Sequence, residues 1–288
     1  ILLSAEENMV LASGIDRHGD GGIYYETLDP TSLKAGNQII ANAGGNLGLK
    51  AIQTHSGKGT AFTAQGNIVD ETALLQEHKI THWSKGKKEE HWERHAPSHH
   101  QVTEGSFSML AGGAQVLVAP KVNAPKIIYR ATGNITFHDV HDTYTKQEEI
   151  KDTKRTWYGG NKTITKKAFY AEAKSKGAEL ISDNPIEIES EKGNVHVVHL
   201  HAKTPELILK ALQGKVRIDL GVDHILWGYS EQKKDIFWQS STSHVEEHKT
   251  YSPSQITGKI TIFSKEGVDI EQVRGQTLAW MNRLSVEG

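Results

Sequence analysis

The sequence predicts an all-β protein, a right-handed parallel β-helix with three β-hairpin insertions outside the helix. Three observations lead to this fold. Glycine-led units recur at fixed intervals, short stretches between them alternate apolar and polar residues, and charged arms with aromatic tips interrupt the rhythm. Repetition of this kind is typical of stacked units that contact only their neighbours, rather than of one globular core.

The glycine-led units are spaced by about one turn of such a stack. Gly66 follows Gly45 by 21 residues, and Gly133 follows Gly113 by 20. Between the glycines, stretches such as 216–220 place an apolar residue at every second position, which indicates a strand with one buried face. Because Gly and Asn both tolerate positive φ, the Gly-Asn pairs that open several units are interpreted as turns. Each unit of about 20 residues is then one coil, stacked at about 4.8 Å per coil.

An antiparallel sandwich is the alternative fold, because it also has short strands and frequent turns. Only Pro205–Leu212 has a locally helical pattern, and its spacing from the neighbouring strands indicates a coil strand instead. The near absence of helical patterns together with the long-range period favours the β-helix.

Three long interruptions are expected to form antiparallel hairpins, over residues 75–103, 139–174 and 223–253. In the second, polar strands flank 159–161, a Gly-Gly-Asn sequence typical of a hairpin turn. The turns of the first and third are expected near 85–87 and 239–241. An isolated hairpin is marginal in water, so we expect the arms to lie on the flank of the helix or on one another.

Composition narrows the class of protein. The 288 residues include no cysteine, which excludes disulfides and thiolate chemistry. The formal net charge of -2 offers no large basic field, which argues against nucleic acid as a partner. No apolar run approaches the roughly 18 residues expected of a membrane-spanning helix. The chain begins at Ile1 without an initiator Met, so we interpret 1–288 as a single β-helix fragment of a larger protein.

The Gly-Asn coils and charged arms resemble the repeats of filamentous haemagglutinin. Segments 142–149 and 154–162, a charged strand followed by a Trp-Tyr-Gly-Gly-Asn tip, look like the second repeat class of these proteins, in which a charged hairpin with an aromatic tip interrupts the coil. The resemblance covers Gly36 to Val273. Lysine follows Gly214 and Gly258 where asparagine would be usual, and the secretion-domain and toxin-boundary signatures of the family are absent, which leaves the activity of the parent protein open.

The resemblance implies a location and partners. Such repeats belong to large exoproteins of bacterial two-partner secretion, which include adhesins and contact-dependent growth inhibition effectors. The chain is then expected to be secreted to the bacterial cell surface through an outer-membrane two-partner-secretion transporter. Part of its work would lie at the outer membrane or a surface receptor of a target cell. No cofactor is expected.

Histidines are the first candidates for chemistry, since six of the sixteen lie in the first arm: His78, His82, His91, His95, His99 and His100. His91 and His95 would stand about 13 Å apart on a strand, too far to share a metal. His199 and His201 would share a strand face and could bind a metal with a third ligand, and His138, His141 and Asp142 form a weaker cluster. A solvated polar face on a β-ribbon is the preferred explanation of these residues, so no metal site is predicted.

Aromatic residues are the second group of candidates, because they gather near the arm tips or along the arm strands. They are Trp83, Trp92, Trp157, Tyr158, Phe237 and Trp238. Such residues could contact a receptor, a glycan or a membrane interface, since Trp joins an apolar body to a polar handle. The structural alternative is that each tip aromatic packs back onto the flank of the helix.

The sequence therefore predicts a mechanical, non-enzymatic protein: a stiff rod that holds a distal adhesive or toxic module away from the producing cell. One alternative is direct receptor or glycan binding through the arms. Another is a polysaccharide-active β-helix enzyme, which would use carboxylates where coils meet arms: Asp139, Asp142, Asp219 and Asp223.

Overall fold

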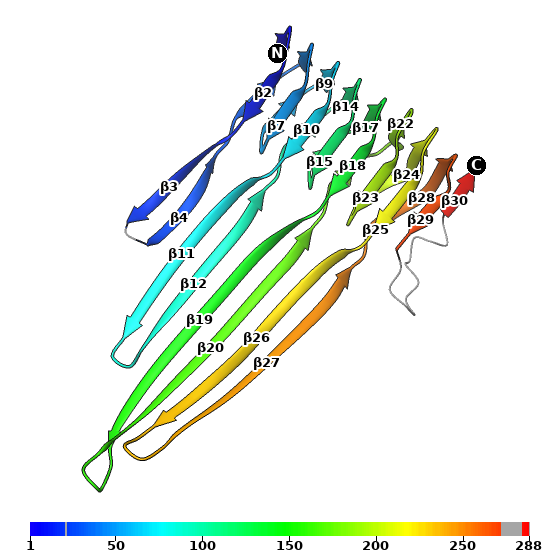
Figure 1. Cartoon of the computed structure of the whole chain (residues 1–288). Helices are drawn as coiled ribbons and strands as arrows, with labels where there is room; N and C mark the ends of the chain where they lie inside the picture. The colour runs from blue at the N-terminus through cyan, green and yellow to red at the C-terminus, as the bar shows by residue number, and fades with distance from the viewer. Residues whose placement is uncertain (21, 272–283, 288) are drawn as a thin grey trace.

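A computed structural model describes residues 1–20, 22–271 and 284–287, and the end of the haemagglutinin-like region at Val273 falls outside them. The described residues form strands and turns with no helix, so the prediction of an all-β protein is confirmed. The strands make three sheets, two parallel and one antiparallel (Figure 1). The two parallel sheets are called the parallel body here, and the antiparallel sheet the blade.

The larger parallel sheet contains fourteen strands and is continuous through one long strand, β24. Residues 201–203 of β24 pair with β21, and residues 207–211 pair with β22. Its strands are β1 (Leu2–Ala5), β5 (Ser32–Ala35), β6 (Gln38–Ala43), β8 (Gln53–Ser56), β9 (Gly59–Ala64), β13 (His99–Val102), β14 (Ser106–Ala111), β16 (Lys121–Asn123), β17 (Lys126–Ala131), β21 (Glu179–Ile181), β22 (Ile186–Ser190), β24 (His201–Ala211), β28 (Gln255–Ser264) and β30 (Leu284–Glu287).

The smaller parallel sheet contains eight strands. They are β2 (Met9–Ala12), β7 (Leu47–Lys50), β10 (Ile68–Glu71), β15 (Gln115–Val118), β18 (Ile135–His138), β23 (Val195–Val198), β25 (Val216–Asp219) and β29 (Val268–Ile270). Strand β24 includes most of Pro205–Leu212, so the assignment of that segment to a strand rather than a helix is confirmed.

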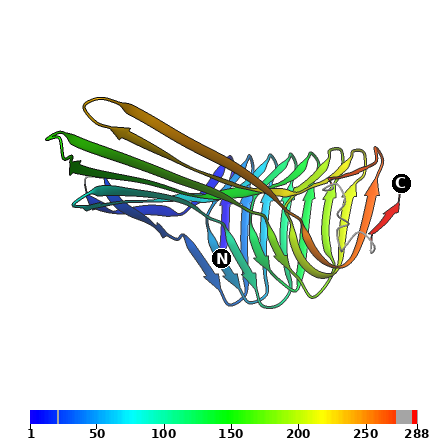
Figure 2. The same cartoon turned by 90° about the horizontal axis from the view of Figure 1, so that it is seen from below.

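Successive strands of each parallel sheet come from successive passes of the chain, as Figure 2 shows. Long passes of 38, 47, 59 and 53 positions alternate with short passes of 21, 20 and 21. The pairs that define them, in chain order, are Leu2↔Ile40, Gln38↔Gly59, Gly59↔Ser106, Ser106↔Lys126, Ile127↔Ile186, Ile186↔Leu207 and Leu207↔Ile260. This topology is compatible with a parallel β-helix and differs from the antiparallel sandwich.

The core lies between the parallel sheets and is a stack of inward side chains from neighbouring passes. Phe62, Phe107, Tyr129 and Phe137 are fully buried, and their rings meet edge to face at centroid distances of 5.2 to 6.0 Å. Burial alternates along strands such as β17, where every second residue is buried. The period-2 pattern in the sequence therefore marks the side chains that fill this stack.

The Gly-Asn pairs lie at turns between strands, as the sequence predicted: Gly45-Asn46 separates β6 from β7, and Gly66-Asn67 separates β9 from β10. The predicted reason, positive φ, is wrong. None of these glycines or asparagines is among the residues with positive φ. Instead the asparagine side chains bond from pass to pass: Asn46 Oδ1 accepts the N–H of Asn67 at 2.8 Å, and Asn67 Oδ1 accepts that of Ala114 at 2.7 Å. A Cβ on Gly66 or Gly113 would overlap the asparagine oxygen of the preceding pass. Glycine precedes asparagine because it leaves room for this ladder.

The described residues of the blade form one antiparallel sheet of four hairpins, where the sequence predicted three arms lying on the flank of the helix or on one another. In sheet order from the C-terminal edge its strands are β27 (Gln239–Ser252), β26 (Gly221–Lys234), β20 (Asn161–Lys176), β19 (Val140–Arg155), β12 (Gly86–Ala96), β11 (Ala73–Trp83), β4 (Ile23–Asp29) and β3 (Gly14–Asp20). We name the pairs hairpin I (β3–β4), hairpin II (β11–β12), hairpin III (β19–β20) and hairpin IV (β26–β27). Hairpin I was not expected, although a Gly-Gly pair follows Asp20.

The expected bounds of the arms also change. Hairpin II ends at Ala96, and His99–Val102 belongs to the larger parallel sheet as β13. Its turn lies at residues 84–85, because Trp83 pairs with Gly86. Hairpin IV turns at residues 235–238 rather than 239–241, because Asp235 Oδ1 accepts the N–H groups of Phe237 and Trp238 at 2.7 and 3.1 Å. An Asp that bonds its own following backbone is a turn signal that outweighs the serines after it.

The spacing of the hairpins along the chain explains why they form one sheet. Neighbouring strands lie about 4.8 Å apart, so a two-stranded hairpin occupies about 9.6 Å of sheet. Two passes of the parallel body rise by about the same distance. Each hairpin leaves a long pass, and a short pass separates it from the next, so the edges meet: β4 pairs with β11, β12 with β19 and β20 with β26.

Ion pairs between residues two apart on one strand lie on both faces of the blade. Residues i and i+2 share a face of a strand. Distances in these pairs run from 2.6 to 3.2 Å, in Lys87–Glu89, Lys88–Glu90, Lys146–Glu148, Glu149–Lys151, Glu172–Lys174 and Glu231–Lys233. Each exposed pair contributes only about 0.2 to 1 kcal/mol, so main-chain pairing and cross-strand aromatic contacts carry most of the stability.

Candidate functional site

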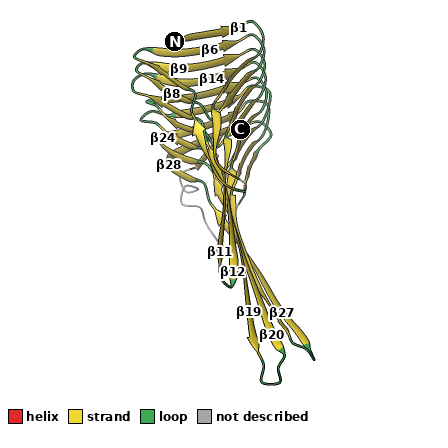
Figure 3. Ribbon diagram, turned by 90° about the vertical axis from the view of Figure 1, so that its left-hand side faces the viewer, coloured by secondary structure: helices red, strands yellow, loops and turns green. Residues whose placement is uncertain are grey.

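The tips of hairpins III and IV meet at the far end of the blade, away from the parallel body (Figures 1 and 3). Trp157 and Tyr158 lie in the turn of hairpin III, and residues 235–238 form the turn of hairpin IV. The rings of Tyr158 and Phe237 are 5.8 Å apart, and the Tyr158 hydroxyl donates to Asp235 Oδ2 at 3.2 Å. Ile236 packs over Gly160, where a Cβ would overlap its side chain. These residues are called the tip cluster.

The tip cluster is the most exposed group of large apolar side chains in the described part of the blade. Trp157 is 95% exposed, Phe237 79% and Ile236 64%. Tyr158 and Trp238 are 40% and 45% exposed. The structural alternative, in which each tip aromatic packs back onto the body, is therefore wrong for these hairpins. Single exposed apolar residues are ordinary, but a contiguous exposed cluster is a candidate interaction site.

Basic side chains surround the tip cluster. Lys154 pairs across hairpin III with Lys162, and Lys234 pairs with Thr163, the next residue along β20. The Lys162 ammonium lies 5.5 Å from the centre of a Trp238 ring, within cation–π range. Asp152 and Asp235 are carboxylates nearby. Asp152 Oδ2 lies 3.8 Å from Lys154 Nζ, and the pKa of Asp235 is lowered by the N–H of Phe237, by that of Trp238 and by the Tyr158 hydroxyl. The end of the blade therefore combines an apolar apex with flanking positive charge.

Trp83 and Trp92 lie apart from the tip cluster and pack within the blade. The Trp83 ring covers Gly86, its partner across hairpin II, where a Cβ would meet the indole at 2.5 Å. Trp92 stacks on Tyr144 with ring centres 5.1 Å apart. The Tyr144 hydroxyl donates to Glu90 Oε1 at 2.8 Å, and burial together with this carboxylate raises the pKa of Tyr144 to about 12. These contacts join hairpins II and III.

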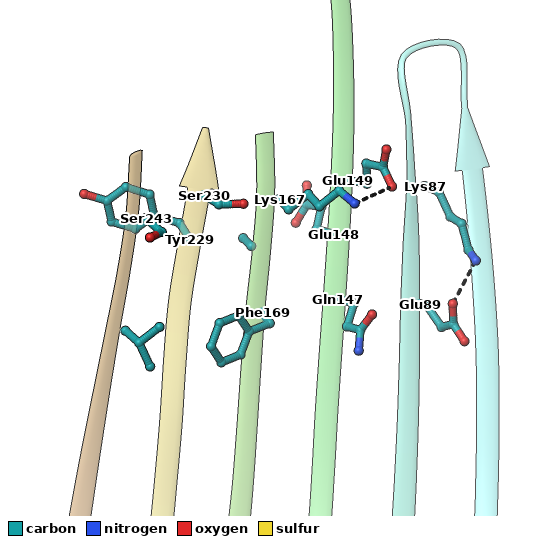
Figure 4. Close-up of a pocket in the computed structure, with 12 residues that line it drawn as sticks. Lys87, Glu89, Gln147, Glu148, Glu149, Lys167, Phe169, Tyr229, Ser230 and Ser243 are labelled. Carbon is teal, nitrogen blue, oxygen red and sulfur yellow. Dashed lines mark ion pairs between the residues drawn. The ribbon is translucent and has the colours of Figure 1, made fainter. Parts of the chain in front are cut away.

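A shallow groove of about 400 Å³ crosses one face of the blade (Figure 4). Phe169 and Val245 form part of its floor, and the Phe169 ring lies over Gly228, where a Cβ would meet the ring at 2.6 Å. Ion pairs line its rim: Lys87 bonds Glu89 at 2.8 Å, and Lys167 lies 3.8 Å from Glu149. The groove offers an apolar strip between charged edges.

The carboxylates proposed for glycan chemistry each have a local partner. Asp139 accepts from Ser175 Oγ at 2.7 Å, Asp219 accepts from Arg217 Nε at 2.7 Å, and Asp223 accepts from the N–H of Ser175 at 2.7 Å. Burial acts to raise the pKa of Asp142, but hydrogen bonds from His95 and Lys176 bring it down to about 2. An ionised, bonded carboxylate is a poor general acid near neutral pH.

The two histidines considered as metal ligands are close together but do not share a strand face. His199 lies at the corner between β23 and β24, outside both strands, while His201 begins β24. Their Nε2 atoms are 3.0 Å apart and bond each other. Within residues 1–20, 22–271 and 284–287, no group of three or more His, Asp or Glu side chains is placed to hold a metal ion.

Zinc added to the metal-free protein is expected to leave its melting temperature unchanged. The Nε2 atoms of His199 and His201 already bond each other, and a stable structural zinc site needs four ligands. Differential scanning calorimetry with and without a small molar excess of zinc measures this, with magnesium as the control. A rise of several degrees specific to zinc would contradict the expectation.

Ile236 and Asp235 belong to the tip cluster, and the sequence reasoning did not select them. The available signal was their position directly before Phe237 and Trp238, since Asp often opens a turn. The meeting of two tips separated by 77 residues had no local signal in the sequence.

Comparison with known proteins finds no matching family model, curated protein or solved structure. A search of the described residues finds no helix long and apolar enough to cross a membrane.

Proposed function

We propose that the chain is a segment of a right-handed parallel β-helix from a secreted bacterial surface exoprotein, and that its work is mechanical. The body is the rod, the hairpins are insertions outside it, and the blade carries the tip cluster toward a target cell. The segment presents, or helps to deliver, a distal adhesive or toxin module. It does so without catalysis. Export through a two-partner-secretion transporter follows from the haemagglutinin-like repeats, which motivate this part of the proposal.

The tip cluster is the observation that carries the proposal. A stiff support is needed only if something at its end must reach a distant surface, and the most exposed aromatic side chains of the described blade stand at that end. The apex consists of two hairpin turns, whereas a stable protein–protein interface needs about 800 Å² of matched surface on each partner. Trp, Tyr and Phe flanked by lysine fit a lipid–water interface, where aromatic rings enter the headgroup region and lysine meets anionic groups.

The double variant Trp157→Ala/Phe237→Ala is expected to lose membrane binding by at least about tenfold without losing stability. Burying each aromatic side chain is worth about 1.5 to 3 kcal/mol. Trp157 and Phe237 are 95% and 79% exposed in the isolated protein, so their loss removes little packing from the folded state. Co-sedimentation with phosphatidylethanolamine–phosphatidylglycerol vesicles measures the affinity, and thermal unfolding measures the stability. Binding that is unchanged in the double variant contradicts the proposal.

Trp83→Ala is the matched control. Its ring covers Gly86, so we expect a lower melting temperature and unchanged vesicle binding by the folded protein. Binding to whole target cells that survives protease treatment of the cells supports lipid recognition. If the protein binds cells but does not bind vesicles, the result supports the second candidate function, which is direct recognition of a receptor or glycan through the arms. The groove over Phe169 favours that candidate, and Val245→Lys would then reduce cell binding.

A further inference from the structure

Three short passes turn the same corner in the same way, but one of them carries a histidine. Where the chain leaves the smaller parallel sheet without a hairpin, a single residue adopts positive φ: Ala51 at 50°, Ala119 at 45° and His199 at 49°. Non-glycine residues in this region are uncommon. The alanines show that the corner does not need a side chain beyond Cβ, so the imidazole of His199 calls for another explanation.

His199 is buried and sits in a row of four hydrogen-bonded residues. Its Nδ1 lies 2.6 Å from Ser175 Oγ, and Ser175 Oγ lies 2.7 Å from Asp139 Oδ2. Its Nε2 lies 3.0 Å from Nε2 of His201. The carboxylate can only accept, so the Ser175 hydroxyl donates to Asp139 and His199 Nδ1–H donates to Ser175. His199 Nε2 is then the acceptor, and His201 Nε2–H donates to it.

This row holds the roots of the two long hairpins. Asp139 directly precedes β19 of hairpin III, and Ser175 lies near the end of β20. Gly221, the first residue of hairpin IV, approaches so closely that a Cβ there would meet His199 Nδ1 at 2.5 Å. Asp223 of hairpin IV accepts the Ser175 N–H at 2.7 Å. Both hairpins therefore rest on the His199 ring.

We propose that His199, His201 and Ser175 form a proton-sensitive latch that holds the roots of hairpins III and IV to the parallel body at neutral pH and loosens in acid. One added proton leaves one of the two rings as a charged imidazolium, and an N–H still donates between the rings. A second proton places N–H groups on both facing nitrogens, 3.0 Å apart, and the bond between the rings is lost.

The groups that face the latch set the balance of charge around it. Asp139 before β19 and Asp223 on β26 favour a protonated His199, whereas His201 on β24 and His141 on β19 oppose it. Glu179 on β21 pairs with His201 in the sheet, and Lys121 on β16 bonds Glu179 at 3.1 Å. Burial, followed by His201, lowers the pKa of His199 below its usual value.

The direction of the pH effect follows from this lowering. A released His199 binds a proton below about pH 6.5, while the latched ring stays neutral. The population of the unlatched state, relative to the latched state, therefore rises as the pH falls through this value. The rise is up to about tenfold per pH unit for each proton. The change ends once the pH falls below the pKa of the latched ring.

Hydrogen exchange at pH 7.5 and 5.5, corrected for the intrinsic rate, tests the latch. In the wild type we expect the opening constant of the amides near Ser175 and Asp223 to rise at the lower pH, by up to about tenfold, with amides of β6 and β9 unchanged. His199→Ala, which places at this corner the residue found at the other two, is expected to abolish the pH dependence. Exposed His55→Ala is the matched control and should behave as the wild type.

A pH-independent opening constant in the wild type overturns the proposal, and so does a pH dependence that His199→Ala retains. If His199→Ala does not fold, His201→Asn provides the second measurement. It keeps the buried ring but removes the facing imidazole, and the opening constant should then change less steeply with pH. An unchanged slope in this variant also overturns the proposal.

Discussion

Deletion of one short pass, residues 106–125, is expected to separate hairpin II from hairpin III while leaving the parallel body in register. Ser106 pairs with Lys126, so the deletion places Lys126 where Ser106 stood, opposite Gly59. Hairpins II and III would then leave adjacent passes, about 4.8 Å apart, although each needs about 9.6 Å of sheet. The eight residue pairs between β12 and β19, from Gly86↔Ile150 to Glu93↔Thr143, should be lost.

The expected effect of this deletion is large and local. With roughly 1 kcal/mol of net stabilisation per hydrogen bond, protection of the facing amides of β12 and β19 should fall by about 100-fold or more. Hydrogen exchange with mass spectrometry measures this. Replacing residues 152–164 with an Asn-Gly turn shortens hairpin III outside the β12–β19 contact, and should leave that contact protected. Retained β12–β19 protection in the pass deletion would refute the spacing argument.

Phe107→Ala is expected to destabilise the body by about 4 kcal/mol. The ring is fully buried and contacts His100, Phe62 and Tyr129, with centroid distances of 4.8, 6.0 and 5.9 Å. The resulting cavity adjoins a buried polar group in which Ser98 Oγ donates to Asp70 Oδ1 at 2.5 Å and His100 Nε2 lies 3.5 Å from Asp70 Oδ2. Chemical denaturation followed by circular dichroism measures the change.

Leu110→Ala on the same strand is the control for Phe107→Ala. Leu110 is 38% exposed on the outer face of β14, so its loss should cost about 1 kcal/mol or less. Because each pass contacts only its neighbours, the damage from Phe107→Ala should concentrate in β9, β14 and β17. Equal effects of the two substitutions would show that the inward stack does not form the core.

The pattern of the sequence was sufficient for the strands of the parallel body. Alternation such as Val216, Ile218 and Leu220 depends only on which face of a strand is buried, and the passes that contain no hairpin come at 20 or 21 positions. The Gly-Asn pairs lie at turns, as predicted, but not because of positive φ. The pairs were recognised as a repeat, but their role is the ladder through Asn46 and Asn67, which needs the height of the neighbouring pass to be known.

By itself, the sequence determined the all-β class, the regular passes and the polar arms with aromatic residues near their turns, because periodicity and turn residues act within one unit. Only the tertiary structure decided that four hairpins form one blade, that the tip of Tyr158 meets that of Phe237, and that His199 supports two hairpins. The physical reason is that these contacts depend on the rise of the body between distant segments. The rise over two passes equals the width of one hairpin, and no single stretch of residues encodes this match.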